Sequence, residues 1–429
     1  VLFRSLNMIN NQAVDCGCDE IPQVLLSTDE ALEILTNSAS SNSKTHLVAL
    51  DDALDQILAA DISSNINVPG FDNSAMDGYA INLKDEQVNA LGGVKFEISD
   101  RIPAGSIGRL LEPGYAARIF TGAPVPDGAN TIIMQEECEL IENDLKIEIY
   151  RPISLNENIR PKGNDIKSGE VILKVGTKLR AQDIALAASV GAGEIKVFQK
   201  IKVGVFFTGD ELIEPGNALK DGQIYNSNRY ALVAMLKNLN CEIINLNNVE
   251  DTLDATVNAL ESLKEKCDLI MTTGGVSVGE EDHVKPAVQQ LGELNLWRIK
   301  MKPGKPLAFG RVGDTAFIGL PGNPVSAMVT FLLFARPFIK KIQGASHYLN
   351  TTIKVEANFD WHRSKPRREF VRARLDHTTT PARANQYPKQ GSEVLSSMVW
   401  ADGLIEIPEK TTFKQGEILN FYPLSEMML

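Results

Sequence analysis

The sequence predicts an α/β protein with several domains, in which a central parallel-sheet domain is accompanied by additional β domains. Apolar strands alternate with amphipathic helices over residues 201–342, a pattern typical of a parallel sheet with helices on both faces. Short strands separated by Gly/Pro turns fill residues 68–150, and β-rich sequence returns from Tyr348 onward. A chain of 429 residues is also too long for one hydrophobic core, so several domains are expected.

The N-terminal part is predicted to contain a flexible tail over residues 1–20, followed by a mixed linker domain and an inserted β domain. The linker domain should combine residues 21–66 with residues 161–197. Ser27 or Thr28 can cap its first helix, and further helices are expected over residues 50–60 and 181–189, with a strand over 195–198. The inserted β domain spans residues 67–160, with strands expected over residues 78–81, 94–98, 116–120, 131–134 and 146–149.

The central α/β domain is predicted over residues 198–346, and a C-terminal β domain over residues 347–429. In the central domain, strands are expected over residues 201–207, 241–246, 267–271, 296–301 and 315–318. Helices are expected over residues 228–239, 253–265, 284–291 and 324–342, because apolar residues recur there at helical spacing.

Composition disfavours several classes of function. The net charge of −12 argues against general binding to nucleic acid or to an acidic membrane surface, since both need a positive field. No apolar run is long enough to span a membrane, and the N-terminus lacks a secretory signal pattern, so we expect a cytoplasmic protein without membrane partners. The five cysteines and five histidines show no zinc-type spacing, and an odd cysteine count disfavours a disulfide scaffold.

The ends of the predicted strands carry acidic residues and glycine turns. In an open parallel sheet, ligands bind beyond the carboxyl ends of the strands. Carboxylates follow three strands, namely Asp210 and Glu211 after the first, Asp251 after the second, and Asp282 after the third. Glycine turns follow two strands, one containing Gly274, Gly275 and Ser277, and the other running through Pro321, Gly322 and Asn323 to a helix that starts at Pro324.

These residues predict a site for phosphate or a similar oxyanion. Glycine turns and helix N-termini present backbone N–H groups to an anion. The carboxylates would repel that anion, so a hard cation is expected between them, with Mg²⁺ the best match. Arg298, Lys300 and Lys302 alternate along a strand and should share one face, and Lys305 follows a Pro-Gly turn. Each motif alone could be an ordinary turn or a solvated edge, but all four lie where the fold predicts a ligand.

With these motifs in place, the chain resembles the molybdopterin molybdenumtransferase family, which includes MoeA and the corresponding domain of gephyrin. The resemblance covers about residues 21–424 and rests on six strings in a fixed order. The strings are Val-Pro-Gly-Phe-Asp-Asn-Ser-Ala-Met-Asp-Gly-Tyr-Ala at 68–80, Arg-Ile-Phe-Thr-Gly-Ala-Pro at 118–124, Thr-Gly-Asp-Glu-Leu at 208–212, Gly-Gly-Val-Ser-Val-Gly at 274–279, Lys-Pro-Gly-Lys-Pro at 302–306 and Gly-Leu-Pro-Gly-Asn-Pro-Val-Ser at 319–326.

The resemblance implies an elongated homodimer of four-domain chains with a MogA-like central domain. It implies binding of adenylylated molybdopterin and molybdate, and Mg²⁺-dependent insertion of molybdenum with release of AMP. A molybdopterin adenylyltransferase is the implied transient partner. The implied cleft lies between the α/β domain of one subunit and the β domain of the other.

Roles carried over by resemblance fall on both domains. Asp77 and Thr121 would come from the β domain, and Glu211, Asp251, Asp282, Arg298, Lys302 and Lys305 from the α/β domain. The implied Mg²⁺ ligands are Asp210, Glu211, Asp251 and Asp282. The implied cofactor-binding residues are Gly274, Gly275, Ser277, Pro321, Gly322, Asn323 and Pro324. Some relatives carry Lys near position 298, whereas Arg298 offers a planar fork rather than a point charge.

The sequence leaves two other hypotheses about the function open. A nucleotide pyrophosphatase could use the same α/β domain, although it would not need the string at 68–80 or the C-terminal β domain. A non-catalytic dimeric scaffold is the second, and the clustered charges argue against it. The choice between molybdenum and tungsten is also open.

Overall fold

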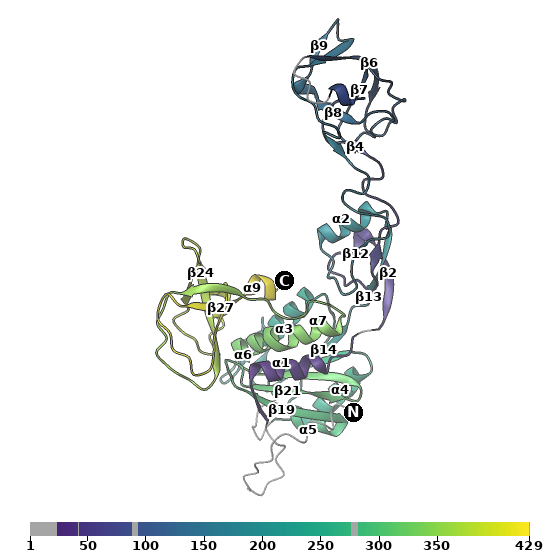
Figure 1. Cartoon of the computed structure of the whole chain (residues 1–429). Helices are drawn as coiled ribbons and strands as arrows, with labels where there is room; N and C mark the ends of the chain where they lie inside the picture. The colour runs from purple at the N-terminus through teal and green to yellow at the C-terminus, as the bar shows by residue number, and fades with distance from the viewer. Residues whose placement is uncertain (1–23, 42, 88–92, 276–281, 429) are drawn as a thin grey trace. The chain divides into compact units, whose positions relative to one another are not determined.

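The computed structural model describes residues 24–41, 43–87, 93–275 and 282–428 (Figure 1). The predicted tail over residues 1–20 therefore lies outside the described residues. The chain divides into two compact units. One contains the described residues up to Lys44 together with those from Gln199 onward, and the other is Thr45–Phe198.

The first unit is built on a seven-stranded sheet, which confirms the predicted α/β fold class. Its strand order is β1-β19-β21-β22-β18-β14-β17. The strands are β1 (Val24–Leu26), β19 (Gly292–Ile299), β21 (Pro306–Val312), β22 (Thr315–Leu320), β18 (Leu269–Thr273), β14 (Lys202–Thr208) and β17 (Glu242–Val249). Neighbours pair in parallel except around β21, which runs antiparallel to both β19 and β22. The sequence did not predict β21, because its seven residues follow a Pro-Gly turn and a basic stretch that resemble a loop.

Helices cover both faces of this sheet, and the strands are apolar for that reason. The helices α4 (Leu253–Lys264) and α5 (Val284–Leu291) cover one face. The other face is covered by α1 (Thr28–Asn37), α3 (Ser227–Asn238) and the continuous helical run of α6 (Pro324–Thr330), a π-helical turn (Phe331–Ala335) and α7 (Arg336–Ile342). In β14, Val205 and Phe207 enter one core while Phe206 enters the other. Each such buried side chain contributes about 1.5–3 kcal/mol of hydrophobic stabilisation.

The segment before residue 45 belongs to the α/β unit, which corrects the predicted linker domain. β1 forms one edge of the sheet and pairs in parallel with β19, with Leu25 opposite Arg298. Ser27 and Glu30 form a capping box at the start of α1, and α1 packs against α7 and β19. Residues 24–37 therefore complete this sheet and its helical layer instead of pairing with residues 161–197.

The C-terminal part forms a closed ring of strands. Pairing runs through β24 (Arg368–Asp376), β25 (Arg383–Gln386), β23 (Ile353–Ala357), β27 (Ile418–Pro423) and β26 (Gly403–Ile407), and β26 pairs back onto β24. A short strand β20 (Met301–Lys302) leaves the α/β sheet and pairs in parallel with β24. That pairing fixes β24 beside the basic segment of the α/β domain.

The second unit contains a six-stranded sheet and a smaller mixed module. The sheet order is β8-β5-β7-β6-β10-β9, with strands β8 (Thr131–Met134), β5 (Gly78–Ile81), β7 (Tyr115–Ile119), β6 (Val94–Ile102), β10 (Lys146–Ile149) and β9 (Glu139–Ile141). The two short strands β4 (Asn73–Ser74) and β11 (Ile159–Arg160), which precede and follow the sheet strands in the sequence, pair with each other. The mixed module pairs β2 (Thr45–Ala49) with β13 (Glu194–Phe198) and β3 (Ile62–Ser63) with β12 (Val171–Leu173), and it carries α2 (Ala181–Ser189).

The prediction of a helix over residues 50–60 is wrong. Only a 3₁₀ turn over Leu50–Asp52 is helical there. Asp55 has a positive φ of 61°, and the backbone N–H of Leu58 donates to Thr177. The backbone N–H groups of this stretch thus donate to residues 177–179 and to β13, so they are not available for helical hydrogen bonds.

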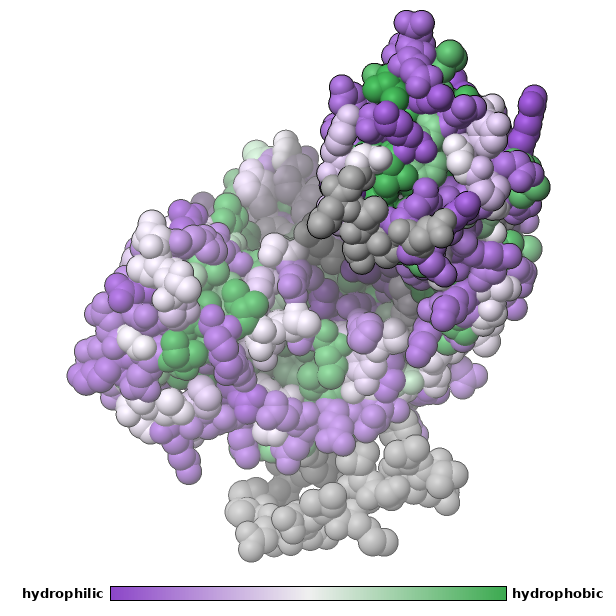
Figure 2. Space-filling view, turned by 45° about the horizontal axis from the view of Figure 1, so that its top comes forward, coloured by the Kyte–Doolittle hydropathy of each residue, from purple (hydrophilic) through white to green (hydrophobic). Residues whose placement is uncertain are grey.

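The surface is predominantly polar on the face shown in Figure 2, where hydrophobic residues form separate patches. Within the part of the chain that the structure describes, no helix is long and apolar enough to cross a membrane.

Candidate functional site

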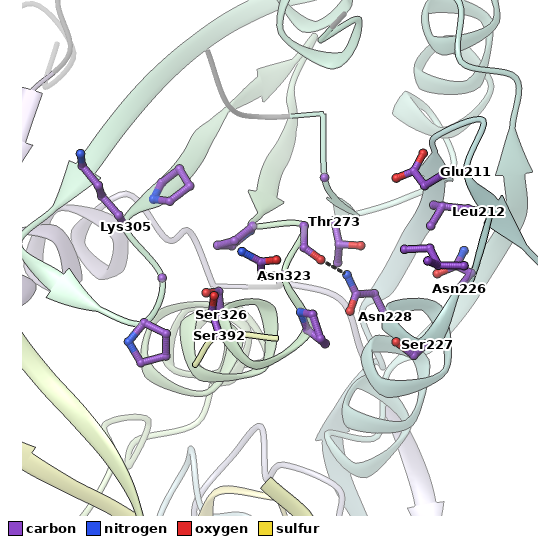
Figure 3. A pocket seen from close by; sticks show the side chains of 18 of the residues that line it. Glu211, Leu212, Asn226, Ser227, Asn228, Thr273, Lys305, Asn323, Ser326 and Ser392 are labelled. Atoms are coloured by element: carbon purple, nitrogen blue, oxygen red, sulfur yellow. Dashed lines mark hydrogen bonds between the residues drawn. The ribbon is translucent and has the colours of Figure 1, made fainter. Parts of the chain in front are cut away.

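A pocket of about 820 Å³ lies at the carboxyl ends of β14, β18 and β22, where the sequence predicted a ligand (Figure 3). Thr208 ends β14, Thr273 ends β18, and Pro321 follows β22. Its described lining residues are Thr208, Glu211, Leu212, Ile224, Tyr225, Asn226, Ser227, Asn228, Thr273, Gly274, Met301, Lys302, Pro303, Gly304, Lys305, Pro306, Pro321, Gly322, Asn323, Pro324, Ser326, Arg367 and Ser392.

The two predicted glycine turns meet in this pocket. The amide of Gly274 donates to the carbonyl of Leu320 at 3.0 Å, and Gly274 has a φ of +83°. A Cβ built on Gly322 would lie 3.6 Å from the Cα of Gly274. Since neither residue carries a side chain, the backbone of both turns stays accessible to a ligand. Pro321, Asn323 and Pro324 continue the same wall, as predicted.

The N-terminus of α3 forms a neighbouring wall that the sequence did not single out. Asn226 caps α3 by accepting a hydrogen bond from the amide of Arg229. Asn228 donates from its side chain to the carbonyl of Gly322 at 2.6 Å, so α3 is tied to the glycine turn. The run Asn-Ser-Asn just before an apolar helix is a capping signal that could have indicated this wall.

The opposite wall is basic. Lys302 and Lys305 line the pocket as predicted, and Arg367 joins them from the segment just before β24. Lys302 Nζ lies 3.5 Å from the carboxylate of Glu369, whose side chain is 5% exposed, and Lys365 Nζ lies 2.7 Å from the same carboxylate. Figure 3 shows Lys305 and Glu211 at opposite ends of the view. The pocket therefore offers two lysines and an arginine against one carboxylate in its described lining.

The C-terminal ring of strands closes this wall. Arg367 and Ser392 both come from it, and the carbonyl of Ser392 accepts a hydrogen bond from the amide of Val325 at the start of α6. Sequence reasoning missed both residues. Arg367 stands in a Pro-Arg-Arg run and Ser392 follows a glycine, and neither pattern reveals that the segment reaches a pocket in another domain.

Several predicted residues are not brought to the pocket. Of the four predicted metal ligands, Glu211 lines it, while Asp210, Asp251 and Asp282 are absent from its described lining. Among the described residues, no three His, Cys, Asp or Glu side chains come together to hold a metal ion. A four-carboxylate cage is therefore absent from the part of the chain that the structure describes.

Three further predicted residues, Arg298, Gly275 and Ser277, are also absent from the described lining of the pocket. Arg298 pairs with Pro306 near the end of β19, and Pro306 lines the pocket whereas Arg298 is not among the described lining residues. The predicted alternation itself is present, since Trp297, Ile299 and Met301 are buried while the basic residues between them are partly exposed. Gly275 follows the turn but faces Val284, and Ser277 lies outside the described residues.

Asp77 and Thr121 are brought together in the second unit, although they are 44 positions apart in the sequence. The Asp77 carboxylate accepts hydrogen bonds from the Thr121 amide and the Thr121 hydroxyl, both at 2.7 Å. The amide hydrogen bond is the main cause that lowers the pKa of Asp77, and the hydroxyl adds to it. The side chain thus presents a fixed carboxylate on an exposed loop.

Comparison with known proteins gives a consistent picture. Residues 26–191 match the model of the MoeA N-terminal region (domain I and II), residues 204–341 that of a probable molybdopterin binding domain, and residues 354–424 that of the MoeA C-terminal region (domain IV). A molybdopterin molybdenumtransferase of Haemophilus influenzae is 36% identical over 410 residues, covering 94% of this chain and 100% of that protein. The chain belongs to the molybdopterin molybdenumtransferase family.

Other members of this family agree with the assignment. A molybdopterin molybdenumtransferase of Staphylococcus aureus is 34% identical over 91% of this chain and 94% of its own length. A crystal structure of a molybdopterin biosynthesis moeA protein from Pyrococcus horikoshii superposes with a TM-score of 0.81 at 31% identity, covering 93% of this chain and 100% of that one. Membership in the molybdopterin molybdenumtransferase family confirms the predicted resemblance and makes the chain a transferase of molybdenum cofactor biosynthesis.

Proposed function

We propose that this chain inserts molybdenum from molybdate into adenylylated molybdopterin and releases AMP in a Mg²⁺-dependent reaction. The observation that carries the proposal is the division of one pocket into two kinds of wall. Glycine turns and the start of α3 form one wall, while Lys302, Lys305 and Arg367 form the other. Such a pocket can hold a phosphate-bearing ligand and a second oxyanion side by side.

The glycine wall suits the phosphate groups of the substrate. The backbone N–H of Gly322 can approach a phosphate closely, because neither Gly322 nor Gly274 places a side chain in the way. The N-terminal turn of α3, a 12-residue helix, adds a favourable dipole end, and Ser227 lines the pocket there.

The basic wall suits molybdate. Lys305 and Arg367 bring positive charge, and Ser326 and Ser392 add hydroxyl donors at the same pocket. A guanidinium can bind two oxygens of a tetrahedral oxyanion at once, whereas a lysine acts as a point charge. Removing one such donor from a catalytic oxyanion site typically costs about 3–4 kcal/mol of transition-state stabilisation.

The pocket lining fits Mg²⁺ only in the mode in which few carboxylates hold the ion and substrate oxygens complete its coordination. Mg²⁺ in nucleotide sites is held by one or two carboxylates, with phosphate oxygens and water completing the shell. Glu211 is the one carboxylate in the described lining, so it is the residue that would hold the ion. When bound, the ion neutralises phosphate charge. Asp210, Asp251 and Asp282 stay as proposed further ligands, and single substitutions of each will show which of them changes the Mg²⁺ dependence.

The proposal is tested by incubating the full chain with adenylylated molybdopterin, molybdate and Mg²⁺ and measuring AMP. Release of AMP that requires molybdate supports insertion, and tungstate in a parallel reaction tests the choice of metal. Release at the same rate without molybdate would indicate a nucleotide pyrophosphatase instead. Failure to release AMP under all conditions would favour a non-catalytic scaffold.

We also propose that Asp77 and Thr121 serve the pocket of a second subunit in a homodimer. They lie in the Thr45–Phe198 unit, whereas every described lining residue of the pocket belongs to the other unit. An Asp77→Asn chain and a Glu211→Gln chain should each be inactive alone. Mixed dimers should recover activity, because one of their two sites would then be intact. Recovery is not expected if each chain builds its own site.

The substrate requires a supplier. An adenylylated molybdopterin must come from an enzyme that transfers AMP onto the molybdopterin phosphate, so we propose a molybdopterin adenylyltransferase as a transient partner. Faster AMP release with that enzyme present than with the same concentration of free substrate would support direct transfer. Equal rates would argue for release into solution.

A further inference from the structure

We propose that Arg372, a buried residue of β24, is a positioning residue that fixes the segment carrying Ser392 at the basic wall of the pocket. The inference rests on the proposed function, because it concerns how that wall is held for molybdate. Arg372 does not line the pocket itself. Its side chain is 1% exposed, which is rare for a cation and requires a reason.

The guanidinium of Arg372 is used to hold a neighbouring segment of chain. Nη2 donates to the carbonyl of Gly391 at 2.8 Å, and Nε donates to the hydroxyl of Ser397 at 3.0 Å. Ser397 is fully buried and in turn donates to the carbonyl of Val394 at 2.6 Å. Arg372 therefore reaches the chain on both sides of Ser392.

The backbone of Arg372 adds a second link. Its amide donates to the side-chain oxygen of Gln390 at 3.0 Å, and the Gln390 side-chain nitrogen donates back to the carbonyl of Arg372 at 2.9 Å. One residue of β24 thus binds the segment at positions 390 and 391, directly before Ser392.

Ser392 is held from the other direction by the α/β domain. Its carbonyl accepts the amide of Val325 at 3.0 Å, at the start of α6. The serine side chain, which lines the pocket, therefore lies between an anchor in β24 and an anchor in α6. Removing the Arg372 guanidinium leaves the segment tied to β24 only through the Gln390 side chain, so Ser392 would be held less firmly.

Buried arginines are usually paired with a carboxylate, but Arg372 has no carboxylate close to it among the described residues. Among the described residues, none places an acidic oxygen within ion-pair distance of Arg372, and the nearest electrostatic support comes from Glu393. Burial lowers the pKa of Arg372 to about 10, which still leaves it charged at neutral pH. The charge is thus retained at a desolvation cost, and its N–H groups are used to hold Gly391 and Ser397.

The test measures molybdate and AMP binding to the full chain by calorimetry. Arg372→Met should weaken molybdate binding by about tenfold to a hundredfold, since a donor displaced by about 1 Å loses that much in effective positioning. AMP affinity should stay within about twofold of the unchanged chain, because the Arg372 side chain makes no hydrogen bond to the glycine wall, which meets this segment only through Val325 and Ser392. Arg336→Met is the matched control. Arg336 is 6% exposed and donates to Asn350 and to the carbonyl of Glu426, away from residues 390–392.

A double-mutant cycle with Ser392→Ala separates positioning from general damage. If Arg372 acts through Ser392, Arg372→Met should add little to the loss that Ser392→Ala already causes. Should Arg372→Met fail to fold, Gln390→Ala cuts the parallel link and should produce the same loss of molybdate affinity with the same dependence on Ser392.

Three results would overturn the inference. Equal molybdate affinity in Arg372→Met and the unchanged chain would do so alone, as would additive losses in the cycle. Equal losses of molybdate and AMP affinity, matched by Arg336→Met, would show that burial of the cation serves stability only. Absence of molybdate binding by the unchanged chain would instead refute the proposed pocket, and this inference with it.

Discussion

Replacement of Gly304 by alanine should destabilise the α/β unit and loosen its basic wall together. Gly304 lies between Lys302 and Lys305, is buried, and has a φ of +98°, where a residue with a Cβ is strained. A Cβ at this position would lie 2.3 Å from the Thr330 hydroxyl oxygen on α6. The backbone strain and the overlap with Thr330 both act on the turn that carries Lys302 and Lys305, so the substitution should shift these lysines and also lower the stability of the unit.

The two costs can be estimated separately. A positive φ costs an alanine about 1–2 kcal/mol relative to glycine. An overlap of this size forces the turn or the helix to move, which costs about 1–3 kcal/mol in a packed core. The Gly304→Ala chain should therefore lose roughly 2–5 kcal/mol of unfolding free energy. Thr330 is fully buried, and within the described structure its hydroxyl has no hydrogen-bond partner.

Thr330→Ala removes the atom that a new Cβ would meet. In that background Gly304→Ala should cost only the backbone term, about 1–2 kcal/mol. Urea unfolding followed by tryptophan fluorescence measures both values. All three tryptophans, Trp297, Trp361 and Trp400, lie in this unit, so the signal reports on it alone. An equal cost of Gly304→Ala in both backgrounds would refute the predicted overlap, and no cost in either would refute the strain as well.

Three other substitutions test separate parts of the molecule. Glu211→Ala should lower Mg²⁺-dependent AMP release at least about a hundredfold with an unchanged unfolding midpoint, and wild-type turnover would remove Glu211 from the metal role. Thr121→Val should raise the pKa of Asp77 toward its ordinary 3.8, measured by NMR titration, because the hydroxyl donor is lost while the amide donor stays. Because the pKa of Asp77 is lowered in the folded state, the stability that this contact provides is present above about pH 4 and is lost as the pH falls through the folded-state pKa. An Asp77 pKa that is the same in Thr121→Val and in the unchanged chain would contradict the contact. Glu369→Gln should cost about 1–3 kcal/mol of unfolding free energy, because its carboxylate is buried between two lysines. The control Glu242→Gln breaks the exposed pair with Lys202 and should cost less than about 1 kcal/mol. Equal costs of the two substitutions would argue against the buried pair.

The sequence predicted the parts of the fold that depend on local patterns. The strand over residues 131–134 and the helices over 181–189 and 284–291 have their predicted bounds. Apolar periodicity and turn residues determine such elements without help from distant contacts. The prediction of a helix over residues 50–60 failed for the opposite reason, since residues 177–179 and the distant strand β13 accept its backbone hydrogen bonds.

The candidate site was predicted in kind but only partly in membership. The glycine turns at 274 and 322, Glu211, Lys302 and Lys305 lie in one pocket, because all of them follow strand ends of one sheet. Arg298 was assigned from strand periodicity, which determines a face of the strand and not its distance to a pocket. Arg367 and Ser392 were missed because they arrive from a separate ring of strands, fixed by the pairing of β20 with β24.

The sequence by itself determined the fold class, the family and the chemical kind of the site, since strings of glycine, acidic and basic residues at strand ends retain their meaning without coordinates. Tertiary structure decided which charged side chains share the pocket and what holds them there. Contacts such as those of Arg372 with Gly391, or Glu369 with Lys302, join segments whose distance along the chain gives no sign of their proximity. Burial of such groups depends on how whole domains pack, and that packing is not encoded in any local pattern.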